Sequence, residues 1–233
     1  MTGMLASVNS LAEALLVLNA EVDIIDLKQP EQGALGALEV ADVKKIVAEI
    51  AGRCPVSATI GDLPMQPELV FNAVKAMSET GVDYIKIGFF PGDDWQGTVN
   101  KLAELTGQNH ALIAVLFADT QVDFAIINLL KVAGFKGVML DTMNKKSGAL
   151  LQVMSMAKIV GFIAQVKKLE LMCGLAGSLR LEDIPVLLPN KVDYLGFRGA
   201  LCQAGNRVGQ LNKQAVMQIK ESIQCVGCLY LVI

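Results

Sequence analysis

The sequence predicts an α/β fold, a single (β/α)8 TIM barrel, on three observations. Short runs rich in valine, isoleucine and leucine alternate with longer segments of helical periodicity, which is typical of a parallel sheet covered by helices. The chain has 233 residues, a length at which single barrels are common. No Pro/Ser-rich linker and no repeat of the solenoid kind interrupts the alternation. We therefore expect one domain over residues 1–233.

The expected strands are the short apolar runs. Valine, isoleucine and aromatic residues favour strands, and nearly continuous apolar runs indicate strands that are buried on both faces. In chain order they lie at Met4–Val8, Val22–Leu27, Val56–Ile60, Tyr84–Gly88, Ala111–Phe117, Gly137–Leu140, Leu169–Gly174 and Val192–Phe197.

The expected helices fill the intervals and carry apolar residues at spacings of three and four. They lie at Leu11–Asn19, Val40–Gly52, Pro67–Thr80, Thr98–Gly107, Val122–Ala133, Ala149–Lys168, Leu181–Pro189 and Gln210–Ser222. Polar residues that favour helix starts suggest N-caps at Ser10, Asp119 or Thr120, and Ser147. Glycines that favour helix ends stand at Gly52, Gly81 and Gly134.

Composition excludes several classes of partner. The net charge of −3 provides no basic field for nucleic acid. The first residues lack the basic region of a secretion signal, and Glu13 interrupts their apolar stretch. The longest apolar helical stretch, Leu150–Val166, is too short and too polar to span a bilayer. We expect a cytoplasmic protein without nucleic-acid or membrane partners.

The cysteines favour reduced thiols. There are five, an odd number, and they are widely spread. Cys225 and Cys228 have the spacing of metal ligands, but no second pair and no histidine lies near them. We therefore expect no metal site.

Charged residues gather at the ends of the expected strands, where barrels carry their chemistry. Asp26 and Lys28 end the second strand at a spacing that points both to one side of the sheet. Lys86 ends the fourth strand, Asp141 ends the sixth, and Lys145 follows in the next loop. One lysine at a strand end is explained by solvation of the rim, but three lysines and two aspartates on one face indicate a catalytic cluster. Burial and like charges favour a neutral amine, the nucleophile of Schiff-base chemistry.

The loops after the seventh and eighth strands have the composition of a phosphate site. Barrels commonly bind phosphate there, through backbone amides and the start of a short helix. Glycine allows close backbone approach, and a guanidinium adds charge. The candidates are Gly174, Gly177, Ser178, Gly196, Arg198 and Gly199. Plain turn chemistry is the alternative explanation for each glycine taken singly.

Two further polar residues receive supporting roles. His110 precedes the fifth strand, so we expect it at the stability face of the barrel rather than the catalytic face. Asp62 follows the third strand, where we expect it to hydrogen-bond a lysine of the cluster.

Six ordered segments carry a resemblance to a known family. They are DIIDLKQPEQGALGA from Asp23, VSATIGDLP from Val56, DYIKIG from Asp83, MLDTMNKK from Met139, GLAGSL from Gly174 and GFRGALC from Gly196. Over nearly its whole length the chain resembles the (5-formylfuran-3-yl)methyl phosphate synthases, also called 4-(hydroxymethyl)-2-furancarboxaldehyde phosphate synthases, of methanofuran biosynthesis.

The resemblance implies a lyase that joins two molecules of glyceraldehyde 3-phosphate into a phosphorylated furan aldehyde, with loss of phosphate and water. It implies that Lys28 forms the Schiff base and that Lys86 transfers protons. Asp26, Asp141 and Lys145 match the remaining polar residues of the family's active site. No metal or organic cofactor is implied, because the lysine supplies the electron sink. A small-molecule substrate and a homo-oligomer are expected.

One segment departs from the resemblance. The apolar C-terminal tail, residues 223–233, extends past the expected end of the family, and its role is open.

Alternative activities share parts of this site. A generic class I Schiff-base aldolase acting on triose phosphates would use Lys28 and the same loops. A decarboxylase of the orotidine-phosphate type would need a further aspartate shortly after Lys28, where Gln29–Gly33 stands instead. A non-catalytic phosphate-binding barrel would use the lysines only to hold anions.

Overall fold

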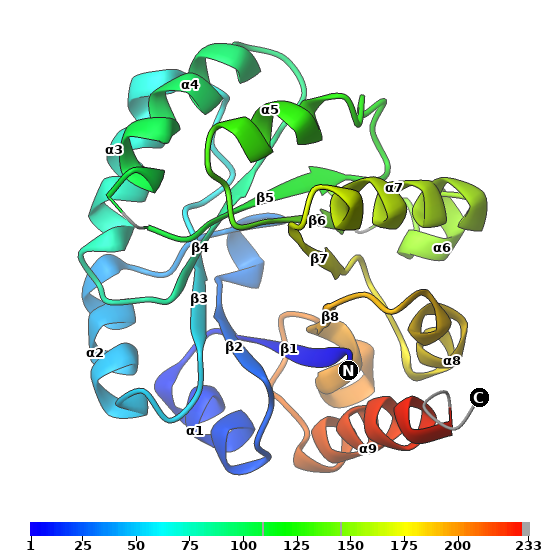
Figure 1. Ribbon diagram of the computed structural model, residues 1–233. Helices are drawn as coiled ribbons and strands as arrows, with labels where there is room; N and C mark the ends of the chain where they lie inside the picture. The colour runs from blue at the N-terminus through cyan, green and yellow to red at the C-terminus, as the bar shows by residue number, and fades with distance from the viewer. Residues whose placement is uncertain (109, 145, 230–233) are drawn as a thin grey trace.

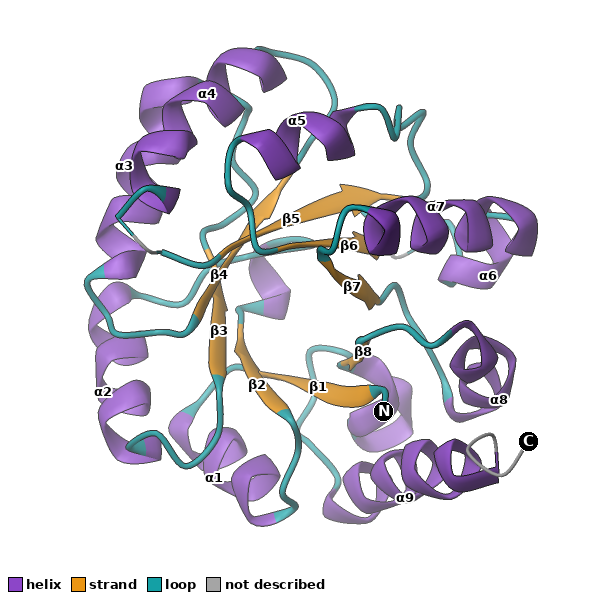
Figure 2. Ribbon diagram, viewed as in Figure 1, coloured by secondary structure: helices purple, strands orange, loops and turns teal. Residues whose placement is uncertain are grey.

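Eight parallel strands close into a barrel inside a layer of helices, as Figures 1 and 2 show. The computed structural model describes residues 1–108, 110–144 and 146–229. Each strand pairs with the next along the chain, and the last pairs with the first. The strands are β1 (Gly3–Val8), β2 (Ile24–Leu27), β3 (Val56–Thr59), β4 (Tyr84–Gly88), β5 (Leu112–Phe117), β6 (Gly137–Asp141), β7 (Met172–Leu175) and β8 (Tyr194–Phe197). The predicted fold class is confirmed.

The α-helices follow the predicted alternation. They are α1 (Leu11–Asn19), α2 (Val40–Ile50), α3 (Pro67–Ser78), α4 (Trp95–Thr106), α5 (Ile126–Val132), α6 (Leu150–Val153), α7 (Met156–Lys168), α8 (Ile184–Leu187) and α9 (Lys213–Leu229). Short 3-10 turns flank them at η1 (Pro30–Gln32), η2 (Leu181–Asp183), η3 (Leu188–Asn190), η4 (Gly199–Leu201) and η5 (Gln203–Gly205). Helix α9 runs into the tail predicted at 223–233, of which residues 230–233 lie outside the described residues.

Several helix boundaries differ from the prediction for local reasons. The single helix expected over Ala149–Lys168 is two, because Met154 adopts an extended conformation between α6 and α7. Helix α6 is capped at Ala149, so the cap expected at Ser147 is wrong. Ser10 does cap α1, since its hydroxyl accepts from the backbone N–H of Glu13. Gly52, Gly81 and Gly134 all have the positive φ angles expected at helix ends.

Asp119 has a different role from the predicted cap. Helix α5 begins only at Ile126, and the Asp119 carboxylate instead accepts the backbone N–H groups of Met143 and Asn144, each at 2.7 Å. Thr120 likewise caps no helix, because its hydroxyl donates to the carbonyl of Phe117. The loop after β5 therefore holds the loop after β6.

Apolar side chains plug one half of the barrel mouth. Leu35, in the loop after β2, is fully buried in the barrel interior. A side-chain methyl added at Gly88, the last residue of β4, would lie within 3.2 Å of Leu35, Phe90 and Phe117. The ring centroids of Phe90 and Phe117 lie 4.6 Å apart. This packing fills the mouth over β5 and the end of β4, and the cavity described below is lined mainly from the side of β6, β7, β8, β1 and β2.

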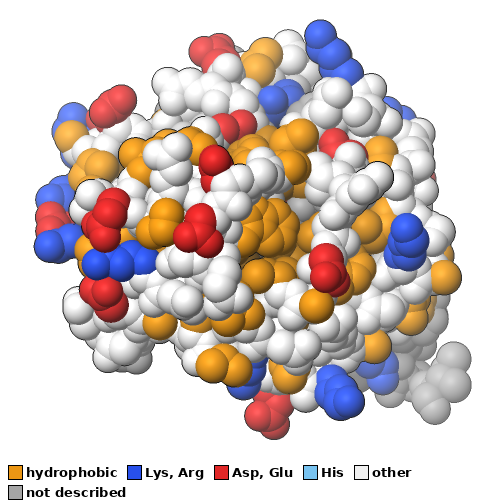
Figure 3. All heavy atoms as spheres, turned by 90° about the horizontal axis from the view of Figure 1, so that it is seen from above, with side chains coloured by type: hydrophobic (Ala, Val, Ile, Leu, Met, Phe, Trp, Pro, Cys, Tyr) orange, Lys and Arg blue, Asp and Glu red, His pale blue; other side chains and the backbone are white. Residues whose placement is uncertain are grey.

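The outer surface is mixed. In Figure 3, hydrophobic side chains gather in the middle of the face seen from above, with acidic side chains among and around them. Within the described residues, every helix falls short of the length and hydropathy needed to cross a membrane.

The plug predicts a stability effect. Leu35→Ala should lower the free energy of unfolding by about 2–5 kcal/mol, because it leaves a cavity in a site that is closed on all sides. The matched control is Leu69→Ala on α3, where the side chain is 42% exposed and the expected loss is about 0.5 kcal/mol or less. Urea unfolding measures both. Equal losses in the two variants would contradict the assigned packing.

Candidate active site

The carboxylate of Asp26 is held by its neighbours on both sides in the barrel. Ser7 on β1 and Ser57 on β3 are its register partners, so all three lie at one level of the sheet. The Ser7 hydroxyl donates to Oδ2 of Asp26 at 2.8 Å, and the Ser57 hydroxyl donates to Oδ1 at 2.7 Å. The fold itself therefore places two donors on this carboxylate.

Lys86 completes the arrangement around Asp26. Its Nζ lies 2.8 Å from Oδ1 and 2.9 Å from Oδ2, and both side chains are buried. Burial alone would raise the pKa of Asp26, but the charges of Lys86 and Lys28, with the hydrogen bonds from Lys86 and Ser57, outweigh it and lower the pKa. Each oxygen accepts two hydrogen bonds, so Asp26 is a fixed negative charge.

Lys28 and Asp141 lie at the floor of the adjoining cavity. Lys28 follows β2 and is 5% exposed, and its backbone N–H donates to the carbonyl of Val8 at 3.0 Å. Asp141 ends β6, and its Oδ1 accepts the backbone N–H of Thr142 at 2.7 Å. With Ser7 and Lys86, both line a cavity of about 580 Å³. Four of the five predicted side chains thus meet at one end of the barrel, and Lys145 lies outside the described residues.

The loop after β7 presents backbone amides to this cavity. Gly177 and Ser178 line it, with φ angles of 106° and 52°. A Cβ at Gly177 would lie 2.9 Å from Cγ2 of Thr142, so only glycine fits. Within the described part of the chain, the N–H groups of Gly177, Ser178 and Leu179 donate to no protein acceptor. They are therefore free to bind an anion.

The glycines of β7 and β8 divide into two kinds. Gly196 and Gly199 line the cavity, whereas Gly174 lies below it in the barrel interior. A Cβ at either Gly174 or Gly196 would lie 3.0 Å from the Met139 side chain. These two glycines make room for Met139, and Gly199 is the one that starts the loop η4 beside the cavity.

Arg198 is committed to the protein. Its Nε donates to the carbonyl of Arg207 and its Nη2 to that of Gly209, at 2.8 and 2.9 Å. Nη1 donates to the carbonyl of Ser7, and both terminal nitrogens bind the carboxylate of Glu13. All the N–H groups of this predicted phosphate ligand have protein partners, so its guanidinium braces the loop after β8.

Sequence reasoning missed three polar side chains of the site. Ser7 and Ser57 are single polar residues inside apolar runs, and this signal identifies them once the strands are aligned beside Asp26. The third is Arg207, which lines the cavity from the loop between β8 and α9. Arg207 does not end a strand, so a search for charged residues at strand ends does not find it.

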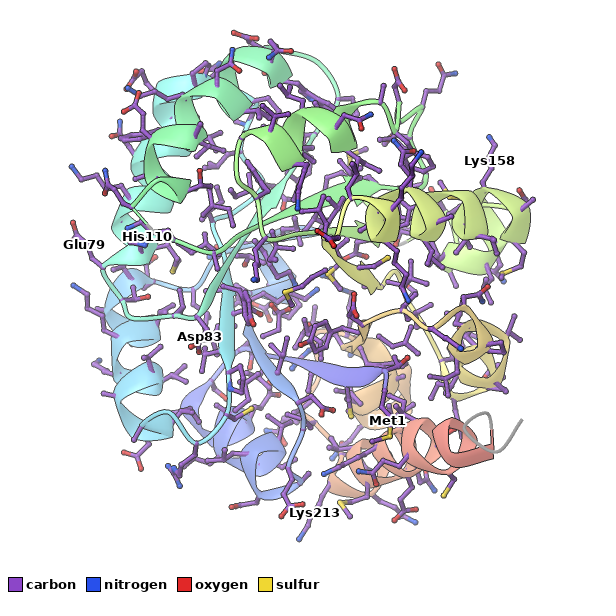
Figure 4. The ribbon with its side chains drawn as sticks, in the orientation of Figure 1. Met1, Glu79, Asp83, His110, Lys158 and Lys213 are labelled. Carbon is purple, nitrogen blue, oxygen red and sulfur yellow. The ribbon has the colours of Figure 1, made fainter. Side chains whose placement is uncertain are left out.

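Asp62 and His110 lie outside the cluster. The carboxylate of Asp62 accepts the backbone N–H groups of Ala34 and Leu35, at 2.8 and 2.6 Å, so the predicted bond to a lysine is wrong. Asp62 instead fixes the loop after β2. His110 precedes β5, and in Figure 4 it lies at the edge of the molecule.

The described cysteines are free thiols. Cys54, Cys173 and Cys202 are buried, and burial raises the pKa of Cys173 to about 12. Cys225 is exposed, and the side chain of Cys228 lies outside the description. In the described ranges, no group of three or more histidine, cysteine, aspartate or glutamate side chains is placed to hold a metal ion.

The fold and the cluster together define a class of protein, an eight-stranded α/β barrel with lysines and carboxylates in a cavity at the carboxyl ends of its strands, where barrel enzymes carry their active sites. The family model described as 4-HFC-P synthase matches residues 4–220, and the chain belongs to this family of enzymes. The match ends before the tail predicted at 223–233.

Curated relatives agree with this assignment. A putative (5-formylfuran-3-yl)methyl phosphate synthase of Methylorubrum extorquens is 41% identical, over 95% of this chain and 91% of its own. The (5-formylfuran-3-yl)methyl phosphate synthase of Methanocaldococcus jannaschii is 30% identical, over 94% of this chain and 98% of its own.

Solved structures show the fold alone. A 3-hexulose-6-phosphate synthase from Salmonella typhimurium superposes with a TM-score of 0.70 at 14% identity, over 97% of this chain and 100% of that one. A phosphoribosyl anthranilate isomerase from Thermus thermophilus gives 0.69 at 14%, with the same coverage.

The buried ion pair predicts that substitutions of Asp26 and Lys86 have strongly coupled effects on stability. Lys86→Met should cost about 3–5 kcal/mol of stability, because it leaves the Asp26 charge buried without its partner. The double variant Asp26→Asn/Lys86→Met should cost less than the sum of the two single variants. The control is Lys45→Met, which breaks an exposed pair with Asp42 and should change little. Additive losses at Asp26 and Lys86 would rule out the coupling; urea unfolding decides.

The lowered pKa of Asp26 predicts a pH dependence. A carboxyl whose folded pKa lies below its ordinary value of 3.8 stabilises the fold fully above that value and loses its contribution as the pH falls through the folded pKa. The stability difference between the wild type and Asp26→Asn should therefore be constant between about pH 5 and 7 and should shrink below about pH 4. Urea titrations across this range measure it. A difference that grows in acid would have the wrong sign.

Proposed function

We propose that the chain condenses two molecules of glyceraldehyde 3-phosphate into (5-formylfuran-3-yl)methyl phosphate, as a step of methanofuran biosynthesis. The condensation proceeds through a Schiff base on Lys28 and releases one phosphate and water. The observation that carries this proposal is the buried Lys28 beside the fixed Asp26–Lys86 pair, in one cavity with backbone amides that have no acceptor among the described residues. Membership of the 4-HFC-P synthase family supports the product.

Lys28 suits the nucleophile better than Lys86. The Lys86 ammonium binds both oxygens of Asp26, whereas Lys28 lies two residues beyond Asp26, where β2 opens into the cavity. The Lys28 amine would attack the carbonyl carbon of one triose, and water would leave as the imine forms. The protonated imine then acidifies the neighbouring carbon, which attacks the aldehyde of the second triose.

Lys86 suits the proton transfers. Lys86 lines the cavity, and the negative charge of Asp26 is fixed beside its Nζ. Cyclisation and dehydration need repeated proton transfers at neighbouring atoms, which one positioned group can serve. Asp141 lines the same cavity at the end of β6 and would share this work, and so, by the family resemblance, would Lys145.

The loops after β7 and β8 suit a substrate phosphate. Gly177, Ser178 and Leu179 offer N–H groups without protein acceptors, and among the described residues the same holds for Gly199 and Ala200. Converging amides bind anions without a lysine or arginine of their own. The cavity volume of about 580 Å³ lies within the usual range of small-molecule sites, about 300–1,000 Å³.

Two further expectations accompany this proposal. The lysine supplies the electron sink, so the scheme uses no cofactor. Assembly into a homo-oligomer stays a prediction, and light scattering on the purified protein would test it.

Trapping tests the mechanism. Incubation with glyceraldehyde 3-phosphate and borohydride should add the mass of one reduced triose phosphate to the wild type, at Lys28 by peptide mapping, and untreated enzyme should release the furan phosphate. Lys28→Ala should lose both signals. Lys86→Gln should lower kcat by about 10²–10⁴-fold, the usual contribution of a general acid–base group.

The matched control is Lys158→Ala. Lys158 is exposed and points outward from α7 (Figure 4), so this variant should trap and turn over as the wild type does. An adduct without furan in the wild type would favour the Schiff-base aldolase instead. Full turnover in Lys28→Ala would end the Schiff-base proposal.

A further inference from the structure

Arg207 reaches the cavity from a loop that is pinned at its base. An isolated antiparallel β-bridge between the backbones of Cys202 and Leu211 brings the two ends of the segment between β8 and α9 together. The buried guanidinium of Arg198 binds the carbonyls of Arg207 and Gly209 from below. The backbone that carries Arg207 is therefore held in place by the barrel.

The side chain of Arg207 spans the cavity rim. Its Nη2 donates to the carbonyl of Gly33, in the loop after β2, at 2.9 Å. Among the described residues, Gly33 provides the only acceptor for this guanidinium, so the remaining N–H groups of Arg207 are unpaired. Burial lowers the pKa of Arg207, the charge of Asp141 opposes this, and an arginine remains cationic at neutral pH.

The position of Arg207 differs from that of the amide loops. Around the closed barrel the order is β7, β8, β1, β2. The amides of Gly177, Ser178 and Gly199 follow β7 and β8, whereas the contact of Arg207 with Gly33 lies two strands further round, on the side of Lys28. The side chain of Arg207 therefore starts beside Gly199 and extends toward the loop after β2, where its Nη2 binds the carbonyl of Gly33.

Among the described residues, Arg207 forms no ion pair within 4.0 Å, although the carboxylates of Asp141 and Asp62 lie near enough for their charges to act on it. Asp26 neutralises Lys86, and Glu13 neutralises Arg198. Arg180 also lines the cavity, but its side chain is 69% exposed and lies near Glu182 at the outer edge. Of the described arginines around the cavity, Arg207 alone is half-buried with unpaired donors.

We propose that Arg207 forms a second phosphate subsite, which holds the phosphate of the second triose while the first is bound to Lys28 and to the amide loops. The inference rests on the proposed function, in which two phosphorylated aldehydes occupy one cavity. A guanidinium presents parallel N–H groups that match two phosphate oxygens, and a partly buried site strengthens that bond. The amides after β7 and the guanidinium of Arg207 would then hold the two substrate phosphates on either side of the Lys28 amine.

The test distinguishes the two substrate molecules by two signals, the borohydride adduct and the furan product. Trapping on Lys28 requires only the first triose, whereas furan formation requires both. Arg207→Gln should keep the borohydride adduct at a wild-type level, and should raise KM for furan formation about 10- to 100-fold, the loss expected for a hydrogen bond to a charged group. Arg207→Lys should recover part of this loss, because it keeps the charge without the paired donors.

Arg180→Gln is the matched control. It removes the same charge from the exposed edge of the cavity and should change KM far less than Arg207→Gln does. Equal increases of KM in the two variants would mean that Arg207 only attracts the substrate at long range, and would overturn the subsite. A parallel loss of adduct and furan in Arg207→Gln would also overturn it, because the residue would then serve the first triose or the loop itself.

Measurements on the wild type distinguish a failure of the proposed function from a failure of the subsite. Absence of both adduct and furan in the wild type would overturn the proposed function and the subsite with it. A wild type that forms both products, with an Arg207→Gln variant that turns over at the same KM, would overturn the subsite alone.

Discussion

The ion pair between Asp26 and Lys86 lies inside the barrel, where charge is costly to bury. It persists because each oxygen of the Asp26 carboxylate accepts two hydrogen bonds. Lys86 donates to both oxygens, and Ser7 and Ser57 donate to one oxygen each. These donors come from β1, β3 and β4, so the pair is satisfied only when the strands on both sides of β2 are in register. The chemistry of the site and the closure of this part of the barrel therefore depend on the same contacts.

A second, largely buried ion pair joins the segments that follow the first and the last strand. Glu13 on α1 accepts from Arg198 after β8, and also from the backbone N–H groups of Asn9 and Leu211. This carboxylate thus ties the loop after β1 to the loop that leads into α9. Because Arg198 also binds the carbonyl of Ser7, the two ion pairs meet at that residue. The loop after β8 is therefore positioned by a network that continues to Asp26.

Sequence patterns predicted the strands and the polar residues at the strand ends. The features that these patterns missed have physical reasons. Asp26, Lys28, Lys86 and Asp141 follow from one rule, because the carboxyl ends of parallel strands must meet. The break between α6 and α7 did not follow, since Met154 is a good helix former whose extended backbone is set by tertiary packing. Asp119 and Arg207 bind segments that are distant in sequence, through one or two hydrogen bonds that no local periodicity encodes.

The loop after β2 fixes both the position of Lys28 and the apolar half of the barrel mouth. Its carbonyl at Gly36 accepts from Thr59 and from the backbone of Gln29, and Asp62 holds the next turn. A Cβ at Gly33 would clash with Asp62, so this backbone path exists only with glycine. The loop begins directly after Lys28 and carries Leu35, the apolar plug. The element that fixes the lysine also closes the far half of the mouth, and an amine placed in this way loses little further entropy when substrate binds.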